Sequence, residues 1–359
     1  MDTIFWPLEA GSLVLKNRIV MAPLTRCRAG ESHMPNSLMA EYYAQRASAG
    51  LIVAEATMAI AGNSAFWKEP GIYSEAQVDA WRQVTDAVHA RGGKIVLQIW
   101  HGGRACHPLL NGGITPVAPS ALAIVGEEVH TPEGKQPYTL PRALETDEVP
   151  DIVAGFAQAA DNAMAAGFDG VEVHGANGYL IDQFLRDGSN VRDDIYGGSR
   201  EARAKFLFDV LDAVCERIGS DKVGLRLSPL NGFNDMRDSD PVGLTAWLTA
   251  RLGRFNLAYL HMMRADFKGE QQGDVLAAVR ENYPGVVIAN MGYTPEEAKA
   301  AVGAGQLDAV AFGVPFIANP DLVERIELGA PLAEADPKTF YSDGPEGYTD
   351  YPTLETAHA

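Results

Sequence analysis

The chain has 359 residues, of which 47% are hydrophobic and 21% charged, a composition typical of globular proteins with a sizeable core. Its formal net charge is -18, and an acidic surface repels phosphodiesters and anionic lipids, which argues against nucleic acid and membrane partners. The three scattered cysteines form no CxxC pair, and the N-terminus lacks a basic region, so we expect a cytoplasmic protein rather than a secreted disulfide framework. As a separate expectation, the protein is a monomer or a weak homodimer.

Short apolar runs recur along the chain and are nearly continuous rather than alternating. This pattern is expected of parallel strands that are buried on both faces. The runs are Ile19–Thr25, Leu51–Thr57, Lys94–Trp100, Gly170–Gly175, Val223–Ser228, Leu257–Met263, Val286–Gly292 and Ala309–Val314.

Helical patterns lie between these runs. Glu75–Arg91, Asp147–Ala166 and Ser199–Ile218 show helical spacing of apolar residues, and each is followed by a glycine that can end a helix. Thr294–Glu297 reads as a capping box with proline at the first helical position, and Asn319–Asp321 opens a last helix that Gly329 closes.

This alternation of strands and helices predicts an α/β fold, namely one (β/α)8 TIM barrel that spans residues 1–359. A doubly wound sheet is the alternative. Its usual dinucleotide fingerprint is absent, because the only GxG, at Gly303–Gly305, follows a helix rather than a strand.

Two segments exceed the minimal barrel. Residues 101–146, after the third strand, are rich in Gly and Pro and are too long for a plain connection, so we expect a lid over the active face. The tail, residues 336–359, holds several tyrosines. We expect it to pack on the barrel as a wrap, with the alternative that one tyrosine, Tyr351, reaches the pocket.

The C-terminal strand ends, where such barrels place their reactive residues, carry hydrogen-bonding side chains. They hold no carboxylate pair, no Ser-His-Asp arrangement and no metal-ligand cluster, so redox or group-transfer chemistry there requires a cofactor. Gly292 and Gly313, after the seventh and eighth strands, occupy the usual phosphate position of the barrel. A flat cofactor with a phosphate, FMN, fits these features.

Motifs along nearly the whole chain resemble the Old Yellow Enzyme family, in its bacterial branch similar to N-ethylmaleimide reductase. Their joint order and spacing carry the resemblance. They are NRIVMAPLTR at 17–26, EYYAQRA at 41–47, QIWHGGR at 98–104, VHGANGYL at 173–180, DIYGGS at 194–199, ANPDL at 318–322 and EGYTDYP at 346–352.

The resemblance implies an NAD(P)H-dependent FMN oxidoreductase that reduces activated C=C bonds of α,β-unsaturated carbonyl or nitro compounds. Thr25 would donate to the flavin C4 carbonyl, Gln98 would bind the pyrimidine edge, and Arg226 would place positive charge near N1 and O2. The cofactor-binding residues it implies are Pro23, Leu24, Thr25, Ala56, Gln98, His174, Arg226, Asn290, Met291, Gly292, Phe312 and Gly313.

For the substrate, the resemblance implies that His174 and Asn177 donate to the carbonyl or nitro oxygen. Hydride from flavin N5 would then reach the β carbon, and Tyr179 would protonate the α carbon from the opposite face. The substrate-binding residues it implies are His174, Asn177, Tyr179, Phe66, Trp100 and Tyr351.

Other functions stay open at this point. The nearest alternative is reduction of nitrate esters or nitroaromatics at the same flavin site. A metal-dependent or Schiff-base lyase would need a carboxylate set or a lysine at the strand ends, which offer only Glu55. A non-catalytic flavin-binding barrel would leave His174, Asn177 and Tyr179 unexplained.

Two positions depart from the pattern of some relatives. At Asn177 some relatives carry a second histidine, which we expect to affect substrate orientation rather than activity, and the other departure concerns the phosphate. Many relatives carry arginine or lysine after the Ala-Phe-Gly of the eighth strand, where it pairs with the FMN phosphate, and this chain has Val314. We therefore expect the phosphate to be held by backbone donors alone, more weakly, or by another cation.

Overall fold

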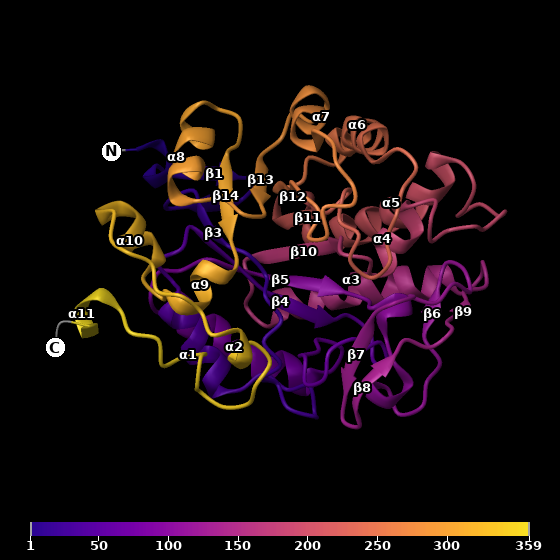
Figure 1. Ribbon diagram of the computed structural model, residues 1–359, viewed down its shortest axis with the longest axis horizontal. Coiled ribbons are helices and arrows are strands. Elements are labelled where there is room, and N and C mark those ends of the chain that lie inside the picture. The colour runs from indigo at the N-terminus through magenta and orange to yellow at the C-terminus, as the bar shows by residue number, and fades with distance from the viewer. Residues whose placement is uncertain (1, 358–359) are drawn as a thin grey trace.

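A closed barrel of parallel strands forms the centre of the protein, and helices surround it (Figure 1). The computed structural model describes residues 2–357. The strands of the barrel are β3 (Ile19–Met21), β4 (Leu51–Met58), β5 (Ile95–Trp100), β10 (Gly170–Gly175), β11 (Val223–Leu227), β12 (Tyr259–Met263), β13 (Val287–Asn290) and β14 (Ala309–Phe312). Their order around the barrel follows the chain, with β14 pairing with β3 and β5 with β10, so the predicted (β/α)8 barrel is confirmed.

Each strand of the barrel is followed by at least one helix. The helices are α1 (Ser37–Gln45), α2 (Glu75–His89), α3 (Val149–Ala165), α4 (Leu180–Leu185), α5 (Arg200–Ile218), α6 (Pro241–Leu252), α7 (Val275–Asn282), α8 (Pro295–Gly303), α9 (Val314–Ala318), α10 (Leu322–Leu328) and α11 (Leu354–Ala357). The predicted capping box is present, because Thr294 accepts from Glu297 N at 3.2 Å and Glu297 accepts from Thr294 N at 3.0 Å. Gly329 closes α10 with φ 64°, a left-handed conformation that glycine adopts without strain.

Although the barrel strands are buried on both faces, their side chains alternate between two environments. On β10, Val171 and Val173 belong to the core between barrel and helices, whereas Glu172 and His174 lie on the opposite, inward face. A separate apolar cluster inside the barrel includes the hairpin of β1 (Leu8–Ala10) and β2 (Leu13–Leu15). Apolar side chains therefore fill the end of the barrel next to this hairpin, and polar side chains lie toward the carboxyl ends of the strands.

The long segment after β5 contains two small sheets, in which the hairpin β7 (Glu128–Thr131) and β8 (Gly134–Pro137) is separate from the pair β6 (Val117–Ala118) and β9 (Arg142–Ala143). Within residues 2–357, no helix has both the length and the apolar character needed to cross a membrane.

The C-terminal tail runs past α1, as the yellow end of the chain in Figure 1 shows. Tyr348 is buried and stacks on Tyr42 of α1 with 4.0 Å between ring centroids. Arg46 of the same turn donates to the Tyr348 carbonyl at 3.3 Å. Residue 1 of the predicted domain and residues 358–359 of the predicted tail lie outside the described residues.

Candidate active site

A cavity of about 220 Å³ lies at the carboxyl ends of the barrel strands. It brings together side chains from β4, β5, β10 and β11, together with the segment after β3 and part of the C-terminal tail. Its lining residues are Pro23, Leu24, Thr25, Arg26, Ala56, Phe66, Gln98, Trp100, His174, Asn177, Tyr179, Arg226, Val314, Ile317, Phe340 and Tyr341. Most of the residues predicted for the site therefore line a single cavity.

Arg226 presents an unpaired cation to this cavity. Its side chain is buried, and within residues 2–357 its guanidinium forms no ion pair and its Nε has no hydrogen-bond partner. An arginine stays charged at any ordinary pH. A buried cation without a protein partner is costly, so Arg226 requires an electron-rich ligand in the cavity.

His174 is the cross-strand neighbour of Arg226 and is held neutral. Burial, followed by the charge of Arg226, keeps the pKa of His174 well below its usual range. Its Nδ1 is buried and has no partner among the described residues. A neutral imidazole still carries one N–H, so His174 can donate one hydrogen bond to a ligand without bringing a positive charge.

The amide of Gln98 is oriented by a hydrogen bond to the carboxylate of Glu172. Its Nε2 donates to Glu172 Oε1 at 2.7 Å, and the two residues are paired across β5 and β10. Because the amide nitrogen faces Glu172, the amide oxygen Oε1 is left to accept a hydrogen bond from a ligand in the cavity.

These groups match the pyrimidine edge of a flavin. That edge offers a carbonyl, an N–H and a second carbonyl in a row. Arg226 supplies donors, Gln98 supplies the acceptor, and the Thr25 hydroxyl can donate at the other end. The residues present therefore fit FMN at its ring.

Asn177 turns an amide N–H₂ toward the cavity. The residue adopts a left-handed φ of 57°, and its backbone N donates to Ser228 Oγ at 2.7 Å. Asn231 donates from Nδ2 to Asn177 Oδ1 at 2.9 Å, which occupies the oxygen and leaves the N–H₂ for a ligand. The sequence did not indicate Ser228 and Asn231 as supports, because they lie in a mixed loop after the fifth strand, far from Asn177 along the chain.

Tyr179 packs its ring edge-on against Trp100 at 4.3 Å and against His174 at 5.1 Å. Burial, and then the neighbouring Tyr138 and Tyr341, raises the pKa of Tyr179 well above its usual range. The phenol is thus neutral over the physiological range, as a proton donor must be. Phe66 lies beside Trp100, with 6.1 Å between ring centroids, and forms another wall.

A second chamber of about 510 Å³ adjoins the first and shares Phe66, Tyr179 and Tyr341 with it. Residues 127–130 and Tyr138 of the long segment after β5 form one side of this outer chamber. The other side comes from Lys338, Tyr341, Ser342 and Asp343 of the tail.

The tail contributes a different tyrosine from the one predicted. Tyr351 does not line either chamber, and its hydroxyl accepts a hydrogen bond from Asp336 N at 2.9 Å. Tyr341 lines both chambers instead and stacks on Phe66 at 5.9 Å. The reason is that Tyr348 is anchored on α1, so the chain beyond it runs away from the barrel mouth.

The residues predicted to hold the phosphate lie next to the cavity in the chain but do not line it. Asn290 and Phe312 end β13 and β14, and Met291, Gly292 and Gly313 follow them, but none of the five lines the cavity. The cavity wall next to these residues is formed by Val314 and Ile317 of α9.

Among the residues that line the cavity, Arg226 is the one cationic side chain that no protein group already engages. Arg26 also lines it, but its guanidinium donates to the carbonyls of Phe340 and Gly347 at 3.0 and 2.8 Å. Val314 is 49% exposed, as an apolar residue at the edge of a binding site would be before a ligand covers it. The departure at Val314 is therefore not compensated by a neighbouring arginine or lysine of the cavity.

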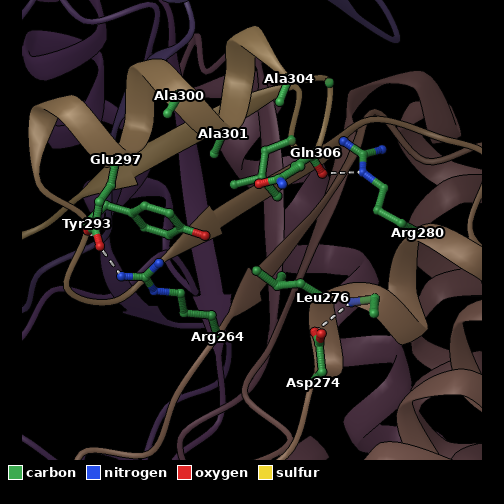
Figure 2. A pocket seen from close by; sticks show the side chains of 13 residues that line it. Arg264, Asp274, Leu276, Arg280, Tyr293, Glu297, Ala300, Ala301, Ala304 and Gln306 are labelled. Atoms are coloured by element: carbon green, nitrogen blue, oxygen red, sulfur yellow. Dashed lines mark hydrogen bonds and ion pairs between the residues drawn. The ribbon is translucent and has the colours of Figure 1, made fainter.

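A larger cavity, about 670 Å³, lies between α7 and α8 and is lined by none of the predicted site residues (Figure 2). Its two arginines are already paired, Arg264 with Glu297 at 3.4 Å and Arg280 with Asp308 at 2.8 Å. Arg264 also donates to the carbonyl of Met291 at 2.8 Å, so it braces the turn after β13 from outside the barrel. With its charges balanced, this cavity is not the candidate site.

A barrel with an unpaired arginine, an oriented glutamine and a neutral histidine at its carboxyl end fits the class of FMN-dependent barrel oxidoreductases. The comparisons agree, because residues 3–333 match the model of the NADH:flavin oxidoreductase / NADH oxidase family. The chain belongs to this family, which includes the Old Yellow Enzymes, and its cofactor is FMN.

Three relatives show how far the similarity extends. The chain is 51% identical to a probable flavin mononucleotide-dependent alkene reductase of Leishmania infantum, over 99% of this chain and 98% of that one. The old yellow enzyme from Trypanosoma cruzi has a similar structure, with TM-score 0.95 and 46% identity over 98% of this chain and 99% of that one. Morphinone reductase in complex with tetrahydroNAD has TM-score 0.94 and 46% identity, over 100% of this chain and 99% of that one.

Proposed function

We propose that this protein is an NAD(P)H-dependent ene-reductase that acts on α,β-unsaturated carbonyl compounds and nitroalkenes. The observation that carries the proposal is the convergence of three donors on one cavity. His174, the N–H₂ of Asn177 and the phenol of Tyr179 all line the space beside Arg226 and Gln98. The names of the similar proteins, an alkene reductase and a morphinone reductase, support the same reaction type.

FMN, when bound, supplies the two-electron carrier between the nicotinamide and the alkene. His174 and Asn177 bind the substrate oxygen, and their hydrogen bonds strengthen as negative charge develops on it. The neutral Tyr179 delivers the proton to the α carbon. Arg226 compensates the charge of the reduced ring, and Thr25 and Gln98 fix the ring's orientation.

We assign the outer chamber to the part of the substrate or nicotinamide that extends beyond the ring. The segment 101–146 would act there as a lid, because its residues 127–130 and Tyr138 form one side of that chamber. Its anchor is Glu127, which pairs with Lys268 and accepts from Asn234 N at 3.3 Å. Aromatic side chains of this chamber, namely Phe66, Trp67 and Phe233, offer apolar surface to that part of the ligand.

A panel of electron acceptors tests this function. The purified holoprotein is given NADH or NADPH together with 2-cyclohexenone, N-ethylmaleimide or a nitroalkene, and nicotinamide consumption and reduced product are measured. We expect turnover with all three alkenes. Turnover with a nitrate ester or a nitroaromatic, and with none of the alkenes, would establish the alternative reductase function instead.

The exposed Val314 leads to a prediction about FMN affinity. Val314→Arg is expected to lower the FMN dissociation constant by roughly 10- to 150-fold, since a charge-assisted hydrogen bond contributes about 1.5–3 kcal/mol and about 1.4 kcal/mol is tenfold. The gain should shrink with added salt, because a partly exposed ion pair is screened. Quenching of FMN fluorescence on titration with apoprotein measures the constant.

The control is Val14→Arg, which adds the same charge at a 61% exposed valine of the β1–β2 hairpin, away from the cavity. It should leave FMN affinity unchanged. If Val314→Arg binds FMN no better than the native chain does, the phosphate is already neutralised, and the valine at position 314 does not weaken FMN binding.

A further inference from the structure

A fully buried carboxylate lies directly beneath the residues that face the flavin. Glu172 of β10 is two residues before His174, so both side chains point into the barrel, one layer apart. Both carboxylate oxygens are engaged: Oε1 accepts from Gln98 Nε2 at 2.7 Å, and Oε2 lies 2.9 Å from His261 Nδ1. The carboxylate therefore links β5, β10 and β12 under the site.

A glycine makes this reach possible. The neighbour of Glu172 on β11 is Gly224, and a Cβ placed there would lie 2.2 Å from the ring of Tyr259. Because β11 has no side chain at this level, the ring of Tyr259 lies against Gly224, and His261 of β12 reaches the carboxylate. The arrangement requires Gly224, and it places a polar layer where an apolar barrel layer would otherwise lie.

Glu172 is ionised in this setting. Burial by itself raises its pKa, but the hydrogen bonds from His261 and Gln98 and the charge of Arg226 outweigh burial and bring the pKa of Glu172 below its ordinary value. His261 is neutral, because burial lowers its pKa more than Glu172 raises it. The imidazole thus donates Nδ1–H to a true carboxylate, and one negative charge lies beneath the ring site opposite the single positive charge of Arg226.

We propose that Glu172 is a positioning residue that sets the reduction potential of the bound FMN by opposing the charge of Arg226 and by orienting the amide of Gln98. Reduced FMN is anionic at N1, so Arg226 stabilises it and a nearby carboxylate destabilises it. The carboxylate thereby keeps the flavin reducing enough to pass electrons to an alkene. This inference rests on the proposed placement of the pyrimidine edge against Gln98 and Arg226.

The test measures the potential of bound FMN, not alkene turnover. Glu172→Gln keeps the shape and removes the charge, and an amide can still accept from Gln98. With the holoprotein at equilibrium with a reference redox dye, the ratio of reduced to oxidised FMN should rise on the order of tenfold at a fixed dye potential. Because no alkene is present, a failed ene-reductase function would not affect this result.

The matched control is Glu69→Gln. Glu69 is also fully buried, but burial raises its pKa well above the ordinary range, and its carboxyl accepts from Ala65 N at 3.0 Å rather than from Gln98. The ratio should then equal that of the native protein. An unchanged ratio in Glu172→Gln, or an equal rise in both variants, overturns the proposal.

A second variant covers the case in which Glu172→Gln does not fold. His261→Leu removes the donor to Glu172 Oε2, so the pKa of the carboxyl rises and the charge is lost as the pH falls. The other groups that face Glu172, namely Gln98, Arg226 and Tyr259, stay in place. The rise in reduced FMN should therefore grow toward low pH in this variant, and a pH-independent ratio difference from the native protein contradicts the proposal.

Discussion

Alanine in place of His174 or Asn177 is expected to slow alkene reduction by about 10²- to 10³-fold for each substitution. Each donor is worth about 2.7–4 kcal/mol if it acts on the developing enolate as an oxyanion donor does. The double variant should be slower than either single variant. Its fold decrease in rate should be smaller than the product of the two single decreases, because the donors share one oxygen. Reduction of FMN by NAD(P)H should fall far less.

Stopped-flow absorbance of the flavin separates these two half-reactions. The control is His89→Ala, since His89 lies on α2 and pairs with Asp169 on the outside of the barrel. It should leave both half-reactions at native rates. If the His174 and Asn177 variants lose both half-reactions equally, these residues do not anchor the alkene oxygen.

Replacing Tyr179 with phenylalanine is expected to slow the oxidative half-reaction with 2-cyclohexenone by about 10²- to 10⁴-fold, the usual contribution of a general acid. The ring and its packing on Trp100 and His174 are kept, so FMN binding and FMN reduction should persist. Reduction of nitro groups should suffer less, because it does not need protonation of an α carbon. An unchanged rate with cyclohexenone would leave water or another group as the acid.

The raised pKa of Tyr179 adds a pH expectation. The phenol acts in its protonated form, and burial moves its loss of the proton above the ordinary value of 10.0. The oxidative rate should therefore stay flat from about pH 6 to pH 9 and should not decline as pH approaches the ordinary tyrosine value. His174 is neutral over the same range because its pKa is lowered, so it contributes no inflection near neutral pH.

The barrel could be predicted from the sequence because its strands are continuous apolar runs with clear stops. The predicted run at Gly170–Gly175 and the structural strand coincide, and the capping box at Thr294 marks its helix correctly. The ends of other runs were predicted too long, as at Ile19–Thr25, where β3 ends at Met21. Beyond that point the chain leaves the barrel to form the cavity wall, which local propensity does not encode.

The side chains at the strand ends could be predicted because strand ends meet at one edge of a barrel. The residues that hold these side chains by hydrogen bonds could not be predicted, since Asn231 and Asn177 are brought together only by the fold. Glu172 did leave a signal, namely a carboxylate inside an apolar strand, but its partner His261 lies two strands away across Gly224. The choice of Tyr341 over Tyr351 depends on the stacking of Tyr348 on α1, a tertiary contact between distant segments.

The most direct test of the central claim is an anaerobic single turnover. The holoprotein is reduced with one equivalent of NADH or NADPH, freed of the oxidised nicotinamide, and mixed with 2-cyclohexenone while the flavin spectrum is recorded. We predict that the yellow oxidised spectrum returns and that one equivalent of cyclohexanone forms per FMN. A flavin that stays reduced with the enone and is reoxidised only by oxygen, a nitrate ester or a nitroaromatic would contradict ene-reduction at this site.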